Sequence, residues 1–295
     1  MHTTSYLYRQ RAVIVCAIAA AAVVLLAVPA SAQIGLGLAP MRVEIRMAAG
    51  QQHSGVLTLT NDSGGKMRVR TELLDFMIDT ADTPQFEKNL PQEQLDSCRT
   101  WLTVNPMEAE IEGKQLLVRY SIRVPEGTPE GSYHCAAGFT SQPPVGQAQA
   151  IGIQTAVRAV AAIYVVIGSP AIVGETKQIS LEPIVAVRAA APADKDSKAA
   201  AAPAPKWNAV VLLENRGHMH FRPVGQLDVL DAADHVVASY EFVQLPVLPQ
   251  RQQRFVFPLT GPIPAAPYRL RARIDIGTGE VQEAVATITD QPSTK

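Results

Sequence analysis

The residues best suited to chemistry in this sequence are the two histidines of His218-Met219-His220. On a strand, alternate side chains point to the same face, so both imidazoles could face one ion, and histidine nitrogen is a common zinc ligand. A zinc site needs three or four protein ligands, and the sequence names no third one. A solvated turn residue followed by a strand residue is the simpler interpretation, so no metal or other cofactor is expected.

The other candidates for chemistry are weaker. His134 lies beside Cys135, but adjacent strand residues point to opposite faces, which separates the base from the thiol. Three closely spaced aspartates could bind calcium: Asp75, Asp79 and Asp82. A solvated acidic loop is the simpler interpretation of those aspartates. The Gly-Gly-Lys at 64–66 lacks the spacing of a phosphate-binding loop, and no Gly-x-Ser-x-Gly elbow is present. We therefore expect a protein that is not an enzyme.

The N-terminus has the pattern of a secretory signal peptide. Arg9 and Arg11 precede an apolar run from Ala12 to Val28, and Ala30-Ser31-Ala32 provides a small-x-small cleavage site. We place the cleavage after residue 32, so that residues 1–32 are removed. A retained membrane anchor is the alternative, but the run is short beside the roughly 20 residues of a spanning helix. The mature protein is expected to be exported, periplasmic and without a membrane span.

Two cysteines remain after this cleavage, Cys98 and Cys135, since Cys16 lies in the removed segment. An even number of cysteines in an oxidising compartment favours one disulfide. Two separate buried thiols are the alternative, because cysteine also packs as a small apolar residue.

The charge of the chain excludes two classes of partner. The formal net charge is −1 at pH 7, and the signal segment removes two arginines and no acid. A nearly balanced, slightly acidic protein has no electrostatic basis for binding nucleic acid or an anionic membrane surface.

A nearly repeated pattern predicts the fold. Val56–Arg70 consists of an alternating strand, a turn of Asn, Asp, Ser and Gly, and a second alternating strand, which indicates a β-hairpin. Val210–Arg222 repeats the plan, and its Gly-His-Met-His-Phe-Arg matches Gly-Lys-Met-Arg-Val-Arg in the first copy. Tyr133 and Tyr268 each open a late strand after a Pro/Gly loop, as in the tyrosine corner of immunoglobulin-like domains. The prediction is an all-β protein of two tandem immunoglobulin-like β-sandwich domains.

The expected domain limits follow from composition. The first domain spans 33–167, the second 168–290, and a tail covers 291–295, with the boundary at Gly168-Ser169-Pro170. Residues 189–206 are rich in Ala and Pro, have no larger apolar anchor, and are expected to form a mobile loop within the second domain. Leu38–Ile45 is expected to be the first strand, with Pro40 near its start.

The stretch Ile151–Ile167 is unusually long for one strand. Its odd-numbered positions are almost wholly apolar and its even-numbered positions are mixed, which is the period of a strand. At about 3.3 Å per residue it would span roughly 56 Å, whereas ordinary strands have about 5–6 residues. A helix is the competing interpretation, but the Ile and Val content and the alternation favour a strand. It either crosses between domains or extends beyond its own sheet.

Several segments resemble, in order, the first domain of the periplasmic pilus-assembly chaperones, the PapD-like family. These segments are Leu38–Ile45, Leu57–Asp62, Trp101–Pro106, Val118–Pro125 and Ala162–Val165. The resemblance covers about 33–167. The second domain is similar to that family only in architecture, and Glu214–Gly225 looks more like the second domain of WxL-interacting surface proteins, which are also exported tandem β-sandwich proteins.

The resemblance implies a boomerang of two immunoglobulin-like domains. In the family, the long last strand of the first domain lends alternating apolar side chains to an incomplete pilin subunit, which is strand addition at a sheet edge. The matching strand here is Ile151–Ile167, and the residues implied to bind the partner are Ile151, Ile153 and Val157.

The family also anchors the terminal carboxylate of the subunit with a basic pair. Arg42 matches the first member of that pair. The second member, a lysine in the family, falls at about Ala161, and the nearest base is Arg158, on the opposite face of an ideal strand. Arg158 therefore departs from the family pattern.

Two non-catalytic functions are compatible with the sequence. The first is a periplasmic chaperone-like protein that binds fimbrial or other secreted subunits by donating the edge of strand 151–167. The alternative is an adhesion module that binds an envelope component such as polysaccharide or peptidoglycan. A strand that fills its own sandwich has the same alternation as a donor strand, so the pattern alone leaves both open.

Overall fold

The protein is built almost entirely of β-strands. The computed structural model describes residues 35–79, 83–88, 90, 96–142, 156–184, 206–261 and 263–289. Apart from the single turn η2(Arg99–Trp101), the regular elements in these ranges are strands. None of the helical segments in this part of the chain has the length and apolar character needed to cross a membrane. The expected signal peptide, Ile151, Ile153, the tail 291–295 and nearly all of the 189–206 loop lie outside the described residues.

The first sandwich contains ten strands in two sheets. In chain order they are β1(Leu36–Ala39), β2(Arg42–Met47), β3(Gln52–Asn61), β4(Met67–Ile78), β5(Pro84–Glu87), β6(Leu102–Asn105), β7(Glu108–Ile111), β8(Gln115–Arg123), β9(Gly131–Gln142) and β10(Arg158–Ile167). One sheet has the order β1-β3-β8-β6. The other has the order β2-β10-β9-β4-β5, and β7 also pairs with β4.

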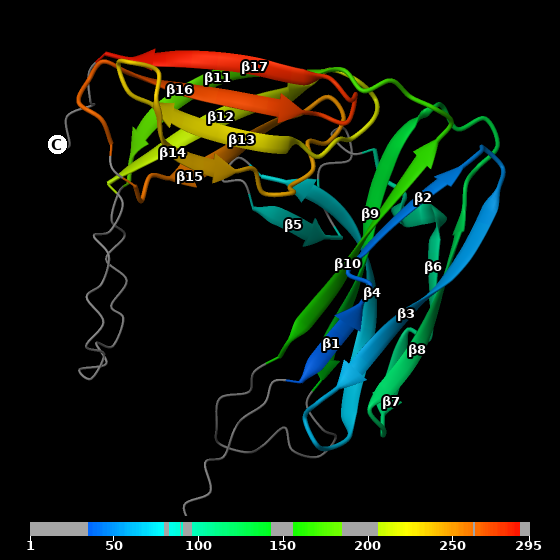
Figure 1. Cartoon of the computed structure of the whole chain (residues 1–295). Coiled ribbons are helices and arrows are strands. Elements are labelled where there is room, and N and C mark those ends of the chain that lie inside the picture. Colours follow the sequence, from blue (N-terminus) through cyan, green and yellow to red (C-terminus); the bar gives the residue numbers. More distant parts are fainter. Residues whose placement is uncertain are drawn as a thin grey trace, which may run out of the picture.

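The second sandwich contains seven strands in two sheets, and Figure 1 shows it set at an angle to the first. Its strands are β11(Gly174–Pro183), β12(Trp207–Asn215), β13(Val224–Leu230), β14(Val236–Glu241), β15(Gln252–Pro258), β16(Tyr268–Asp275) and β17(Val281–Ile288). The sheet orders are β11-β12-β15 and β14-β13-β16-β17. The two immunoglobulin-like sandwiches predicted from the sequence are present.

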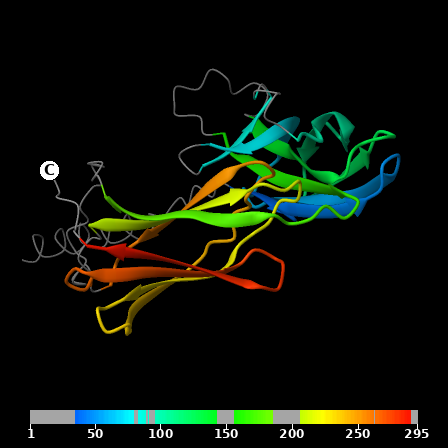
Figure 2. The same cartoon turned by 90° about the horizontal axis from the view of Figure 1, so that it is seen from above.

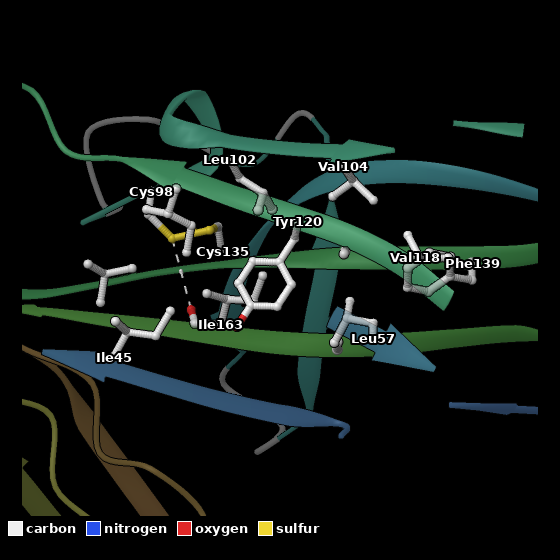
Figure 3. Close-up of a cluster of buried hydrophobic side chains, with 14 of the residues drawn as sticks. Ile45, Leu57, Cys98, Leu102, Val104, Val118, Tyr120, Cys135, Phe139 and Ile163 are labelled. Atoms are coloured by element: carbon white, nitrogen blue, oxygen red, sulfur yellow. Dashed lines mark hydrogen bonds between the residues drawn. A yellow bond between two sulfur atoms is a disulfide. The ribbon is translucent and has the colours of Figure 1, made fainter. Parts of the chain in front are cut away.

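Each sandwich has its own apolar core, because alternate side chains of both its sheets point inward. In β3 the inward positions Leu57 and Leu59 are fully buried, and in β8 they are Val118, Tyr120 and Ile122. Figure 3 shows these chains meeting the residues of β9 and β10 between the two sheets. The turned view in Figure 2 shows the two sandwiches as separate bodies that meet at one junction.

The predicted hairpin of Val56–Arg70 is wrong in its pairing. β3 pairs with β1 and β8, whereas β4 belongs to the opposite sheet and pairs with β9. The turn at Asn61 carries the chain from one sheet to the other. Both strands have an apolar face, and in facing sheets these two faces pack against each other in the core. The echo behaves in the same way, since β12 and β13 also lie in different sheets. In the second copy the strand starts only at Val224, so the echoed Gly-His-Met-His-Phe-Arg is a bend rather than a strand.

The expected first strand Leu38–Ile45 is also divided between sheets. β1 ends at Ala39 and pairs with β3, while β2 starts at Arg42 and pairs with β10. Pro40 has no N–H to donate to a ladder, and the chain changes sheets there.

The two crossing turns are built around equivalent asparagines. The Asn61 amide nitrogen donates to the carbonyls of Gly65 (2.7 Å) and Ile111 (3.2 Å), and its oxygen accepts from the Ser63 N–H (3.0 Å). Asn215 repeats this set, donating to Met219 (2.8 Å) and Val247 (3.0 Å) and accepting from the Gly217 N–H (2.9 Å). Each asparagine is buried, so one side chain satisfies two backbone groups of its own turn and one carbonyl of a segment distant in the sequence.

The tyrosine-corner interpretation holds for one sandwich only. The Tyr133 hydroxyl donates to the Pro129 carbonyl at 3.1 Å, four residues upstream. The Tyr268 hydroxyl is buried and has no hydrogen-bond partner among the described residues.

The predicted disulfide is confirmed and lies in the first core. Cys98 and Cys135 are bonded, and neither has any exposed surface. The Cys98 N–H donates to the His134 carbonyl at 3.3 Å, so the bond ties the segment before η2 to β9. Closing a loop of this length contributes about 2–4 kcal/mol in the chain-entropy description.

We expect Asn215→Ala to destabilise the second sandwich. The substitution leaves the Met219 carbonyl without its donor and leaves the Val247 carbonyl with only the Phe221 N–H at 3.3 Å, at a cost of roughly 1–3 kcal/mol. Urea unfolding followed by tryptophan fluorescence measures it, and a Trp101→Phe background leaves Trp207 as the reporter, because the chain has two tryptophans.

Asn208→Ala is the matched control for this substitution. The Asn208 amide oxygen is buried without a hydrogen-bond partner in the described structure, so its loss should cost much less. Equal destabilisation by the two substitutions would contradict the role assigned to Asn215.

Candidate functional site

Strand β10 lies in the described part of the long stretch Ile151–Ile167. One half of β10 has a neighbouring strand on both sides, and the other half has one on a single side. It pairs with β9 in antiparallel register along its whole length, from Arg158 to Ile167. On its other side it pairs with β2 in parallel register, but only from Ala162 to Ile167. Among the described residues, no strand pairs with this second edge between Arg158 and Ala161.

The apolar odd-numbered face of β10 fills its own core. Ala161, Ile163 and Val165 have no exposed surface, and Ile167 is 3% exposed. These side chains belong to the core cluster of the first sandwich, with Ile163 in its middle in Figure 3. Over residues 161–167, therefore, the alternation reflects packing within the domain.

The backbone of the free end of β10 is directed outward at every second residue. The Val157 carbonyl accepts from the Ser141 N–H at 2.9 Å, so odd-numbered residues pair with β9. The Ala162 N–H donates to the Met41 carbonyl at 2.9 Å, so even-numbered residues face the β2 side. The same alternation directs the backbone groups of Arg158 and Val160 at the open edge.

The two candidate anchoring bases do not meet. Arg42 lies opposite Ala162 in the β2–β10 register, and its side chain is half exposed. Arg158 extends across β9 instead, donating to the Phe86 carbonyl at 2.9 Å. Gly138 makes this crossing possible, because a Cβ there would lie 3.3 Å from the Arg158 Nε.

The sequence reasoning missed a charged cluster at the junction of the two sandwiches. Arg222, from the second sandwich, forms an ion pair with Glu44 of β2 and places its guanidinium 4.7 Å from the ring centre of Tyr164 on β10. Glu44 also lies 3.7 Å from Arg42. Two guanidiniums therefore share the Glu44 carboxylate beside β10. The only signal in the sequence was that Arg222 ends the echoed stretch.

A histidine completes this cluster. The Ser132 hydroxyl is hydrogen-bonded to His220 Nδ1, and His220 Nε2 lies 3.9 Å from Glu44 Oε1. The Ser132 N–H also donates to the His218 carbonyl at 2.7 Å. A neutral His220 with its proton on Nε2 satisfies both ring contacts, since Nδ1 then accepts from the serine.

Ser132, His220 and Glu44 have the order of a nucleophile, base and acid, but they are not arranged for catalysis. Ser132 is 2% exposed and His220 is 3% exposed, so no substrate carbonyl reaches the hydroxyl. The trio connects the two sandwiches instead. His218 is exposed while His220 is buried, because the segment bends. The two imidazoles therefore do not share one face, and His218 is the exposed turn residue that the simpler interpretation expected, although His220 lies before a strand and not in one.

An apolar contact lies next to the charged cluster. Phe76 of β4 and Tyr164 pack with Leu248 of the second sandwich, and all three are buried. Phe86 stacks on Phe76 with ring centres 4.8 Å apart, and His134 meets Phe76 edge-on at 5.6 Å. The even-numbered face of β10 is thus covered by the second sandwich through Tyr164.

The other candidate sites of the sequence, the His134–Cys135 pair and the three aspartates, do not come together as sites. Cys135 faces the core in its disulfide while His134 faces the junction, as the alternation predicted. Asp75 is buried and accepts from Ser97 (2.6 Å) and from Arg99 (3.0 Å), so it is not a loop carboxylate. Asp82 is outside the described residues. Within the described ranges, no group of three or more His, Cys, Asp or Glu residues is placed to hold a metal.

Burial sets the protonation of the junction. It lowers the pKa of His220 to about 4, and the Arg222 guanidinium acts in the same direction. It also lowers the pKa of His134 to about 4, and it raises the pKa of Tyr164 to about 12. Both histidines and the tyrosine are therefore neutral at pH 7, and the charge at the junction belongs to Glu44 and the arginines.

No family model matches the sequence, and no curated protein matches it. The fold is similar to solved chaperones of pilus assembly, the family that the sequence resembled. The YadV chaperone is 14% identical with a TM-score of 0.43, over 86% of this chain and 100% of that one. The CsuC–CsuE pre-assembly complex of Acinetobacter baumannii gives 11% identity and a TM-score of 0.42, over 87% of this chain and 99% of the other.

A third structure, of a chaperone–tip adhesin complex of CFA/I fimbriae biogenesis, is 10% identical with a TM-score of 0.46, over 85% of this chain and 97% of that one. At this identity and similarity the likenesses concern the fold, and the function is argued below from the contacts of this chain.

Acidification is expected to destabilise the protein between pH 6.5 and pH 4. In this pH range, a histidine whose pKa is lowered in the folded state takes up its proton only on unfolding. The histidine contribution to the free energy of unfolding is therefore fully present above about pH 6.5 and decreases as the pH is lowered toward 4. Each histidine contributes a slope of roughly 1.4 kcal/mol per pH unit. Urea unfolding at intervals of half a pH unit measures the slope.

His220→Gln should reduce this slope by about one histidine's share, because glutamine keeps polar contacts to Ser132 and Glu44 without titrating. The control is His235→Gln, which changes an exposed histidine. A slope that is equally steep in the wild type and in His220→Gln would exclude His220 as a source.

Proposed function

We propose that the protein is a periplasmic chaperone-like protein that binds fimbrial or other secreted subunits through the open edge of the strand ending its first domain. The observation that carries the proposal is the half-paired state of β10. Among the described residues it has a neighbouring strand on both edges from Ala162 onward and on one edge from Arg158 to Ala161. An unpaired edge beside a covered core accepts an extended segment by main-chain hydrogen bonds.

The burial of β10 side chains limits which residues this proposal can assign to donation. Ala161, Ile163, Val165 and Ile167 are committed to the core of the first sandwich, so they have no side chain to lend. The donated side chains must come from the residues before Ala161. Val157 and Val160 are half-buried at that end. Ile151 and Ile153, which lie outside the described residues, stay partner-binding residues in this proposal.

The surroundings of the open edge suit an apolar partner. Met41 is 63% exposed next to the point where β2 begins to pair with β10. Leu36 and Leu38 of β1 lie on the opposite sheet and are only partly buried against the core. An added strand would cover apolar surface in addition to satisfying the backbone groups of Arg158 and Val160.

A carboxylate anchor is part of the proposal, with Arg42 as the base that binds the carboxylate. Arg42 is half exposed, and its Nε forms an ion pair with Glu44 Oε1 at 3.7 Å. Arg222 is held on the same Glu44 carboxylate. A terminal carboxylate of a subunit would bind at Arg42 in competition with Glu44, while Arg158 serves β5 and not the anchor.

The proposal also contains the remaining sequence predictions. These are export with cleavage after residue 32, two domains at 33–167 and 168–290, and the absence of catalysis. An adhesion module that binds an envelope component is the alternative outcome of the experiments below.

Val160→Pro should abolish strand addition at the open edge. Proline removes the N–H that β10 directs outward at this position and adds no contact to β9. The measurement is co-purification from the periplasm with pilin-type subunits encoded beside the gene, and recovery is expected to fall at least tenfold. Charged substitutions of Ile151, Ile153 or Val157 should act in the same direction.

Val160→Ala is the control, because it keeps the N–H and shortens only the side chain. Undiminished recovery with both Val160→Pro and Ile153→Asp would exclude strand donation. Recovery of polysaccharide or peptidoglycan, with no subunit, would support the adhesion alternative.

Arg42→Ala should weaken binding of a subunit with a free C-terminal carboxylate by about tenfold, since a charge-assisted hydrogen bond contributes on the order of 1.5–3 kcal/mol. The same substitution should leave binding of a C-terminally amidated subunit nearly unchanged. Titration calorimetry with the two forms measures the difference. An equal loss for both forms would show that Arg42 supports the fold of the site and does not bind the carboxylate.

A further inference from the structure

Strand β17, the last strand of the second sandwich, has a long and regular free edge. It pairs with β16 residue for residue, from Tyr268 opposite Ile288 to Asp275 opposite Val281, without a shift in register. On its other side no strand pairs with it among the described residues. In an antiparallel strand the backbone groups of alternate residues point to each edge, so half of the peptide groups of β17 face this free edge.

The other edge strands of the second sandwich carry features that hinder pairing with another chain. β11 has a bulge at Lys177 and ends at Pro183, and β15 ends at Pro258. The pairing of β14 with β13 is irregular in register. Bulges, lysines and prolines are the means by which sheets prevent association between edges. β17 has no bulge, no proline and no basic residue, and Glu283 is its one charged residue.

Both ends of β17 are held in place from its inner side. The Gln282 side chain donates to the Gly174 carbonyl of β11 at 3.1 Å. At the other end Ile288 packs against the core of the second sandwich. The edge is therefore ordered before any strand is added to it, which reduces the entropy cost of binding.

The outer face of β17 is apolar in its middle. Val281 is 67% exposed and Val285 is 49% exposed. Val285 lies opposite Arg271 of β16, and the Arg271 guanidinium is paired with the buried Asp228 carboxylate at 3.1 Å. The positive charge nearest to Val285 is thus compensated on the side away from the free edge, and an added strand would cover valine.

The sequence of β17 is complementary to itself in antiparallel register. A two-fold axis perpendicular to the sheet keeps outward residues outward, so one residue must lie opposite its own copy. With Val285 on the axis, Glu283 lies opposite Thr287 of the copy, and Val281 lies opposite Thr289. Glu283 has no hydrogen bond or ion pair in the described part of the chain, and a threonine hydroxyl can donate to its carboxylate. The single charge of the strand therefore meets a donor and not its own copy.

We propose that the free edge of β17 binds β17 of a second copy of this chain, in antiparallel register centred on Val285, and joins the two four-stranded sheets into one. One strand from each copy makes a small interface beside the roughly 1,200–2,000 Å² of stable complexes, so we expect a dimer that dissociates in the micromolar range. β17 and β10 belong to different sandwiches, and the inference does not depend on strand donation.

The first test is sedimentation velocity of the full mature chain over a series of concentrations. We expect a reversible equilibrium between monomer and dimer. Val285→Lys should raise its dissociation constant at least tenfold, because it places two ammonium groups side by side on the two-fold axis. The control is Val236→Lys, which changes a valine of similar exposure on β14, at the opposite edge of the same sheet.

The second test is disulfide formation between copies. Residues directly opposite in an antiparallel pair have Cα atoms about 4.5–5.5 Å apart, which suits a disulfide. Val285→Cys should therefore form a covalent dimer without reductant. Val281→Cys should form much less, although position 281 is more exposed, because it lies opposite Thr289. Cys98 and Cys135 are bonded to each other and do not compete.

The outcomes decide between a β17 dimer and its alternatives. A monomer at every concentration of the unaltered protein would overturn the proposal, and this measurement needs no variant that might fail to fold. A dimer that Val285→Lys does not weaken would lie on another surface. Equal covalent dimer from Val281→Cys and Val285→Cys would contradict the register.

Discussion

A strand has two edges and two faces, and in the half of β10 from Ala162 to Ile167 all four are occupied. From Ala162 to Ile167 both edges are paired and the odd face is in the core. The even face meets the second sandwich through Tyr164. Toward Arg158 one edge has no partner strand in the described part of the chain. The junction, the open edge and the core therefore depend on one register, because a shift by one residue would exchange the two faces.

The duplication is clearer in the hydrogen bonds than in the sequence. Asn61 and Asn215 satisfy the same three kinds of backbone group at the same place in each sandwich. Each sandwich also buries an aspartate with no exposed surface, Asp75 on β4 and Asp228 on β13, paired with a serine and an arginine. The sandwiches differ where the first carries the disulfide and a bonded tyrosine corner.

Local pattern predicted the strands well and their partners poorly. The alternation of Val56–Thr60 defines a strand because one face is buried in any sandwich, whichever neighbour lies beside it. Pairing depends on which sheet receives the chain after the turn, and the turn residues Asn61–Gly65 fit a hairpin and a crossing equally well. The crossing turn includes a hydrogen bond from the Asn61 amide to the Ile111 carbonyl, fifty residues away, which the local sequence pattern does not contain.

The junction could not be predicted for a related reason. Glu44, Ser132, Tyr164 and Arg222 are isolated polar residues in four separate strands or turns, and none belongs to a motif. Their proximity follows from how two finished sandwiches meet. Arg158 was correctly placed on the face opposite to the one required, but its actual partner on β5 depended on Gly138 leaving a passage across β9.

The crossing of Arg158 over Gly138 connects the open edge of β10 to the junction between the sandwiches. Arg158 begins the free end of β10, crosses Gly138, and holds the Phe86 carbonyl, while the Phe86 ring stacks on Phe76 against the second sandwich. Arg158 therefore links the strand that carries the open edge to Phe86, and Phe86 links it to the contact with the second sandwich. A partner that shifted the Arg158 end of β10 would therefore also shift Phe86 and the contact between the two sandwiches. The link is the one Arg158 side chain, which crosses β9 at Gly138.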